Sequence, residues 1–142
     1  MRFMIMGPAT KESEADILPS GEEFAAMAKF GEELVNAGVL LDAVGLRSTA
    51  YGARVKFVGG GKPPTVIDGP FTESKELIAG YWIINVASKA EAIAWASRAP
   101  LPAGTQVEIR RIFEDEDFAA ADPTGELRAE DARQREEMAR NQ

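Results

Sequence analysis

The 142-residue chain contains no cysteine and no histidine. Without cysteine it has no disulfide, no thiolate nucleophile and no sulfur-ligated metal, which fits a reducing compartment. Without histidine it lacks the usual general acid or base near neutral pH, so a histidine-based catalytic triad and a histidine-ligated zinc are excluded. Any proton transfer must use Asp, Glu, Lys, Tyr or water. We expect neither a metal nor a cofactor.

Basic clusters and long apolar runs are also missing. The formal net charge is -7 and no Lys/Arg cluster occurs, which argues against a nucleic-acid partner. No run approaches the roughly 18 apolar residues needed to cross a bilayer, and the apolar N-terminal segment is too short for a signal peptide. We therefore expect a cytoplasmic protein without a membrane partner.

The apolar pattern predicts both helices and strands. Ser20 and Glu23 form a capping box for a helix whose apolar residues recur at helical spacing until Gly38. Ser88 and Glu91 begin a second helix in the same way. Strands are predicted over residues 3–6, 39–46, 81–86 and 106–113, and a hairpin over 51–58 and 64–68.

This order of elements predicts an α+β domain of the ferredoxin-like kind, a split βαβ arrangement with an inserted β-hairpin. We expect it to span residues 1–118. Beyond the acidic run at 114–117, residues 119–142 form a charged C-terminal helical extension with few apolar positions. That extension is predicted to be an arm rather than part of the core.

The strands carry apolar side chains on both faces. In the strand predicted over 81–86, Trp82 and Ile84 point one way while Tyr81 and Ile83 point the other. Leaving about eight such side chains in water, at about 1.5 to 3 kcal/mol each, would exceed the net stability of a typical domain. We predict a homodimer formed through these sheet faces. In the alternative, the C-terminal arm covers the face within a monomer.

The run Asp68-Gly69-Pro70-Phe71 is the most distinctive motif. In a structural interpretation, Gly69-Pro70 fixes a turn, Asp68 bonds nearby backbone amides and Phe71 enters the core. In a functional interpretation, the turn lies beside a cleft, Asp68 acts as acid or base, and Lys75 stabilises an oxyanion or binds a carboxylate. Residue types alone leave both interpretations open.

The remaining site candidates are predicted to bind a small organic acid. Arg54 could hold its anionic group, and Asp42 interrupts an apolar strand, where it faces the cleft or pairs with a neighbour. The predicted ligand-binding residues are Phe71, Glu76, Tyr81, Trp82, Asp42 and Arg54, and no metal-binding residues are predicted.

The Asp-Gly-Pro-Phe run, together with segments 32–41, 77–82 and 91–95, resembles the DGPF-motif branch of the YCII-related family. This resemblance implies a dimeric α/β barrel of ferredoxin-like subunits. Relatives use a His-Asp pair with the histidine on or near the first helix. Here that helix offers Phe24, Met27 and Phe30 instead, so the pair does not transfer and Asp68 is its remaining possible counterpart.

The resemblance implies an uncharacterised small-molecule-binding or enzyme-like domain with a cleft near the dimer interface. Relatives commonly have Gly-Glu-Gly-Leu where this chain has Ala43-Val44-Gly45-Leu46, so an acidic residue is replaced by an apolar one. The alternative implied by the resemblance is an accessory or regulatory protein of extracytoplasmic-function sigma factor systems, without catalysis.

Overall fold

The computed structural model describes residues 1–72 and 76–142, in two compact units, Met1–Arg111 and Ile112–Gln142. Each unit is described by itself. The elements of the first unit are β1 (Arg2–Pro8), α1 (Lys11–Glu14), α2 (Gly21–Asn36), β2 (Leu40–Gly45), the 3-10 turn η1 (Thr49–Tyr51), β3 (Ala53–Lys56), β4 (Thr65–Asp68), β5 (Ile78–Asn85), α3 (Lys89–Ala96) and β6 (Glu108–Arg111).

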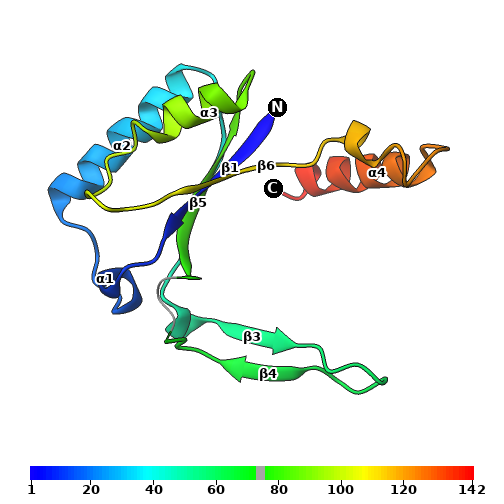
Figure 1. The fold of residues 1–142 in the computed structure, drawn as a ribbon, viewed down its shortest axis with the longest axis horizontal. Coiled ribbons are helices and arrows are strands. Elements are labelled where there is room, and N and C mark those ends of the chain that lie inside the picture. The colour runs from blue at the N-terminus through cyan, green and yellow to red at the C-terminus, as the bar shows by residue number, and fades with distance from the viewer. Residues whose placement is uncertain (73–75) are drawn as a thin grey trace. The chain divides into compact units, whose positions relative to one another are not determined.

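Four of the strands form one antiparallel sheet in the order β2-β5-β1-β6. The two edge strands, β2 and β6, each follow a helix, α2 and α3 respectively, as in the ferredoxin-like arrangement. Helices α2 and α3 lie on the same side of the sheet (Figure 1). β3 and β4 pair separately as a hairpin between β2 and β5. The predicted α+β fold with an inserted hairpin is confirmed.

The two long helices of this unit begin at their predicted caps. The Ser20 hydroxyl accepts from the backbone N–H of Glu23 at 3.2 Å, and the Ser88 hydroxyl accepts from that of Glu91 at 3.1 Å. After α2 the chain reverses through Gly38, whose φ of 72° suits glycine. β5 begins at Ile78, three residues before the predicted start, because its pairing with β1 extends past Gly80.

The core lies between the sheet and the two helices. Its strand side is made by alternate residues of β1 and by Ile84, which face Phe30 and Leu34 of α2. Phe24 and Val35 share the apolar pattern of α2, yet they are 68% and 60% exposed. The pattern therefore overstates the buried face of α2, because its contacts with the core run only from Met27 to Leu34. The buried residues are Phe3, Ile5, Phe30, Leu34, Val39, Ile84, Val86, Ala92 and Ala96.

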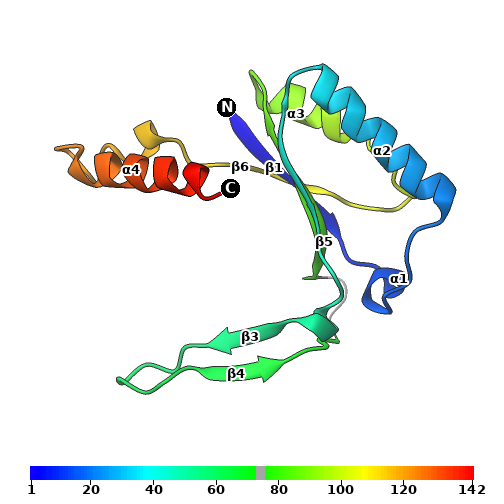
Figure 2. The same cartoon turned by 180° about the vertical axis from the view of Figure 1, so that it is seen from behind.

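The second face of the sheet is the one turned away from α2 and α3. Strand register places Met4 opposite both Ile83 and Arg110, and Tyr81 opposite Met6, so these side chains share that face. Met4, Met6, Tyr81 and Ile83 are half-buried and lie outside the core cluster. The hairpin extends from the end of the sheet toward this side in both views (Figures 1 and 2).

The second unit contains the 3-10 turn η3 (Asp115–Phe118) and helix α4 (Glu126–Arg140). Buried Asp122 accepts hydrogen bonds from the backbone N–H of Arg128 at 2.9 Å and of Leu127 at 3.3 Å. The Arg128 backbone bond is the main cause that lowers the pKa of Asp122. Helix α4 begins at Glu126, within the stretch 119–142 predicted to be a helical extension.

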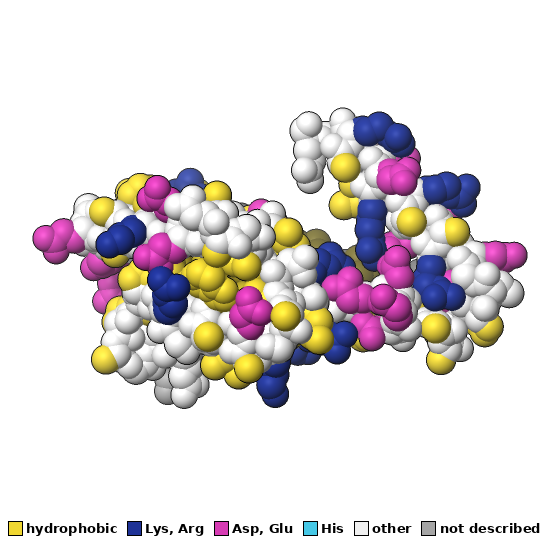
Figure 3. All heavy atoms as spheres, turned by 90° about the horizontal axis from the view of Figure 1, so that it is seen from above, with side chains coloured by type: hydrophobic (Ala, Val, Ile, Leu, Met, Phe, Trp, Pro, Cys, Tyr) yellow, Lys and Arg dark blue, Asp and Glu magenta, His cyan; other side chains and the backbone are white. Residues whose placement is uncertain are grey.

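The surface agrees with the charge pattern of the sequence. Basic side chains are interspersed with acidic and hydrophobic ones on the face shown in Figure 3. Among the described residues, no helix is long and apolar enough to cross a membrane.

Candidate functional site

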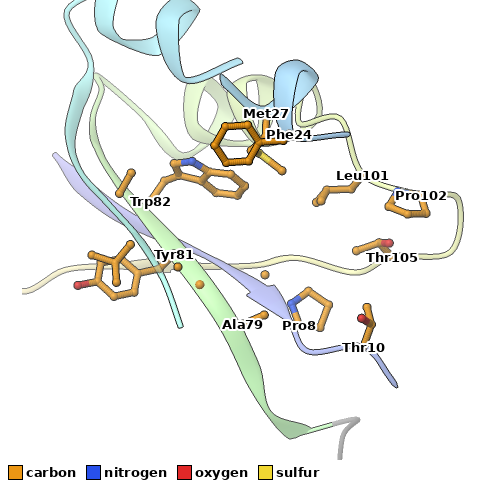
Figure 4. A pocket seen from close by; sticks show the side chains of 15 residues that line it. Pro8, Thr10, Phe24, Met27, Ala79, Tyr81, Trp82, Leu101, Pro102 and Thr105 are labelled. Atoms are coloured by element: carbon orange, nitrogen blue, oxygen red, sulfur yellow. The ribbon is translucent and has the colours of Figure 1, made fainter. Parts of the chain in front are cut away.

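A pocket of about 450 Å³ opens at one end of the layer between the sheet and α2. Five segments that are distant in sequence meet there: the end of β1, the start of α2, the end of β2, the start of β5 and the loop before β6 (Figure 4). Its lining residues are Gly7, Pro8, Thr10, Phe24, Met27, Ala43, Val44, Gly45, Ala79, Gly80, Tyr81, Trp82, Leu101, Pro102 and Thr105.

Trp82 forms the main aromatic wall. Strand alternation sends its indole to the helix side, where the Phe30 ring meets it edge-on at 5.5 Å between centroids. Figure 4 shows the indole beside Phe24 and Met27, with Leu101 across the pocket. A Cβ at Gly80 would lie 2.6 Å from the Val44 carbonyl oxygen, so glycine allows β2 and β5 to approach closely at this site.

The part of the pocket wall that the described residues form is apolar and uncharged. None of its 15 lining residues is Asp, Glu, Lys or Arg, and its hydroxyl-bearing residues are Thr10, Tyr81 and Thr105. A neighbouring hollow of about 390 Å³ shares Phe24, and its single charged residue is Glu23. Transferring a charged group into such a site without an opposite charge is costly. The arrangement therefore suits an uncharged molecule.

The Asp-Gly-Pro-Phe bend differs from the pocket because its backbone is hydrogen-bonded to η1 and to the residue after it. The backbone N–H of Phe71 donates to the Thr49 hydroxyl at 2.9 Å. Thr49 in turn donates to the Glu14 carboxylate twice, from its hydroxyl at 2.6 Å and from its backbone N–H at 3.1 Å. The backbone N–H of Gly69 donates to the Gly52 carbonyl at 3.0 Å.

Gly69 itself is required by close packing. A Cβ at this position would lie 1.7 Å from the Thr49 carbonyl oxygen, which no side chain can tolerate. The glycine thus lets the bend lie directly against η1. The contacts tie the bend to α1 and η1, as in the structural interpretation of the motif.

The structure brings Arg54 and Phe71 together but leaves Asp68 outside the pocket. The Arg54 guanidinium lies 3.9 Å from the centre of the Phe71 ring. Phe71 is half-buried there and lies outside the core cluster, contrary to the expectation that it enters the core, because its backbone is bonded to Thr49. Asp68 is exposed at the end of β4, opposite Ala53. Lys75 lies outside the described residues.

The other predicted site residues are dispersed. Asp42 lies opposite Ile83 on the second face, and its carboxylate accepts from the Ala43 backbone at 2.9 Å. Glu76 is exposed and lines a separate wide hollow of about 910 Å³, which also contains Glu108. Tyr81 and Trp82 both line the pocket, but their rings point to opposite faces of β5 (Figure 4).

Sequence reasoning missed most of the pocket. Phe24 and Met27 follow the apolar pattern of α2, which predicts a packing face, and no sequence signal marks Leu101 or Thr105 as a pocket residue. Across residues 1–72 and 76–142, no group of three or more acidic side chains could hold a metal ion.

Residues 1–119 match the YCII-related domain. The chain belongs to the YCII-related family. No curated protein matches the chain. It is similar to the solved structure of 5-chloro-2-hydroxyhydroquinone dehydrochlorinase (TftG) from Burkholderia phenoliruptrix AC1100, in complex with 2,5-dihydroxybenzoquinone. That match has a TM-score of 0.39 and 18% identity, and it covers 82% of this chain and 98% of the other.

Proposed function

We propose that this YCII-related protein binds a compact, uncharged and largely apolar small molecule in the pocket beside Trp82. The observation that carries this proposal is a 450 Å³ hollow lined by 15 residues, none of them charged. Its volume lies in the range of small-molecule sites, about 300–1,000 Å³. Burial of an apolar ligand there is favourable by about 25 cal/mol for each Å² removed from water.

This ligand class replaces the small organic acid expected from the sequence. A carboxylate in the pocket would lose its hydration without gaining an Arg or Lys partner among the described lining residues, and Glu23 in the neighbouring hollow would repel it. Thr10 and Thr105 offer hydroxyls that can orient a carbonyl or hydroxyl group of a neutral ligand.

We expect the lining residues to supply binding rather than acid–base catalysis, because the described lining contains no Asp, Glu or Lys and its single titratable side chain is Tyr81. A catalytic role for Asp68 and Lys75 is a separate hypothesis that requires a ligand at the bend. The accessory role in sigma factor systems gains no support from the family match or from the pocket.

We also propose that two copies pair through the second face of the sheet. Met4, Met6, Tyr81 and Ile83 give this face an apolar centre, and a second sheet would remove it from water. Tyr81 on this face directly precedes Trp82 in the pocket, so β5 would connect the dimer interface to the ligand site.

Fluorescence of Trp82 tests the ligand proposal. The chain has two tryptophans, so Trp95→Phe leaves Trp82 as the single reporter. This variant is titrated with pairs of small ring compounds that have nearly the same size and differ in charge, such as benzamide and benzoate. We expect neutral members to change the emission and raise the thermal midpoint, and carboxylates to do neither. Binding of the carboxylates in preference to their neutral partners would refute the proposal.

A matched pair of variants locates the binding. Phe24→Asp places a carboxylate on the pocket wall, whereas Val35→Asp makes the same kind of change on an exposed part of the same helix. We expect the first to weaken binding of a neutral ligand at least about tenfold and the second to leave it unchanged. Equal affinities in the two variants would place the ligand elsewhere.

A further inference from the structure

The β3–β4 hairpin has an apolar face that its own strands cannot bury. Val55 lies opposite Val66 on one face, and these side chains are 53% and 62% exposed. Phe57, two residues beyond Val55, is 83% exposed. A two-stranded hairpin is at best marginally stable alone in water, and clustered exposed apolar side chains usually mark an interaction site. We call residues 53–68 the arm; the name does not refer here to the C-terminal extension, residues 119–142.

The opposite face of the arm is basic. Arg54 and Lys56 share that face with Ile67 and Thr65, by the same register. The arm, residues 53–68, contains three of the 16 basic side chains of the chain and one of its 23 acidic ones. A basic segment within an otherwise strongly acidic chain is complementary in charge to another copy of that chain.

The root of the arm is fixed in advance. Gly69 and Phe71 directly after β4 are bonded to Gly52 and Thr49 directly before β3, and Glu14 holds Thr49. An element held this way loses little conformational freedom when a partner binds. The arm also extends toward the second face of the sheet, the side on which a paired copy would lie (Figures 1 and 2).

We propose that the arm is a dimerisation arm, and that the Asp-Gly-Pro-Phe bend serves as its root. Val55, Phe57 and Val66 contact a second copy of the chain, while Lys56 and Lys62 lie near acidic side chains of that copy. This inference rests on the proposed pairing of two copies and is independent of the ligand. It gives the Asp-Gly-Pro-Phe run a role in assembly.

Zero-length cross-linking tests which chain the arm contacts. Full-length chains of normal and heavy isotope content are unfolded together, refolded and treated with a carbodiimide, which joins lysine amines to nearby carboxylates. We expect mass spectra to show links from Lys56 or Lys62 to Asp or Glu residues in peptide pairs of mixed isotope content. Links found only within one chain, or none from either lysine, would overturn the inference.

Sedimentation velocity over a concentration series gives the second test. The single variants Val55→Asp and Val66→Asp should each raise the dimer dissociation constant at least about tenfold. Val35→Asp on α2 should not change it. Far-UV circular dichroism and thermal unfolding confirm that each variant is folded.

A variant of the second face of the sheet distinguishes the proposed pairing through the sheet from the proposed contact through the arm. Met4→Glu should also weaken the dimer. If Met4→Glu dissociates the dimer and the arm variants do not, the arm inference is wrong and the pairing through the sheet stands. If the unmodified chain is a monomer at every concentration, both are wrong. The Trp82 titration reports on the ligand proposal in either case.

Discussion

The pocket and the Asp-Gly-Pro-Phe bend lie in the same unit of the chain but differ in what their groups contact. The bend is polar, and Thr49 is hydrogen-bonded both to Glu14 and to the backbone of Phe71. The pocket is apolar, and its walls, including the indole of Trp82, enclose about 450 Å³ of space. At the bend, the hydrogen-bonding groups pair with other groups of the fold. In the pocket, apolar surface remains available to a ligand.

This difference teaches that the most recognisable motif of a chain need not mark its binding site. Hydrogen-bonded groups at the bend lower the free energy of the fold itself, since each bond is satisfied internally. Apolar side chains around a hollow leave free energy to be gained on binding. The comparison predicts that changes at the bend act on stability, and changes at the pocket act on ligand affinity.

The largest effect is expected at Gly69. Gly69→Ala would place a Cβ 1.7 Å from the Thr49 carbonyl oxygen, so the bend must move away from η1. We expect a loss of about 3 kcal/mol in the free energy of unfolding, measured by urea denaturation. Gly52→Ala is the matched control, because its Cβ would meet the same oxygen at an ordinary 3.7 Å. Equal losses in the two variants would contradict the close approach.

Thr49→Val should have the next largest effect on stability. It removes the hydroxyl that donates to Glu14 and accepts from Phe71, and it leaves both groups without this partner. We expect a loss of about 2 kcal/mol in the same assay, with unchanged affinity for a neutral ligand. Thr65→Val in the exposed strand β4 serves as the control and should cost much less. A larger effect of Thr49→Val on ligand affinity than on stability would contradict the proposal that the bend acts on stability and the pocket on affinity.

Ala43→Leu should show the opposite behaviour. Ala43 lies opposite Trp82 in the register of β2 and β5 and lines the pocket, so a larger side chain there occupies ligand space. We expect affinity for a neutral ligand to fall about tenfold, about 1.4 kcal/mol, in the Trp82 titration. Ala25→Leu, on α2 but outside the pocket lining, should bind as the unmodified chain does. Unchanged affinity in Ala43→Leu would place the ligand outside this pocket.

The smallest effect is expected for Asp68→Asn. Asp68 is exposed at the end of β4 and does not line the pocket. We expect changes below about 0.5 kcal/mol both in stability and in ligand affinity, as is usual for surface substitutions. Calorimetric titration and urea denaturation measure the two quantities. A large loss of affinity would favour the catalytic hypothesis for Asp68.

Local signals were sufficient to predict most of the fold. The caps at Ser20 and Ser88 fixed two helix starts, and alternation in the strand around Trp82 predicted a sheet with apolar residues on both faces. The short elements α1 and η1 were not predicted, because α1 has only four residues, too few for a periodic pattern, and η1 is held by a bond from Thr49 to Glu14, far away in sequence. A contact of that kind leaves no periodic pattern.

The site was predicted only in part, for the same reason. Trp82 was predicted as a wall because aromatic residues on a strand are recognisable in sequence. Phe24 and Leu101 were missed because the pocket forms only when distant segments meet. Asp68 and Arg54 were favoured as site residues for their charge, whereas the structure places neither in the pocket lining. The chemical type of a residue indicates whether its side chain can react. It does not indicate where the fold leaves a pocket.

Nuclear magnetic resonance of the isotope-labelled chain during titration with a neutral ring compound tests the central claim most directly. The two tryptophans give two indole N–H signals, and Trp95→Phe assigns the one from Trp82. We predict that the Trp82 indole and the Thr105 amide shift on titration, while the amides of Gly69 and Phe71 do not. Shifts confined to the bend, with a stationary Trp82 signal, would contradict the account.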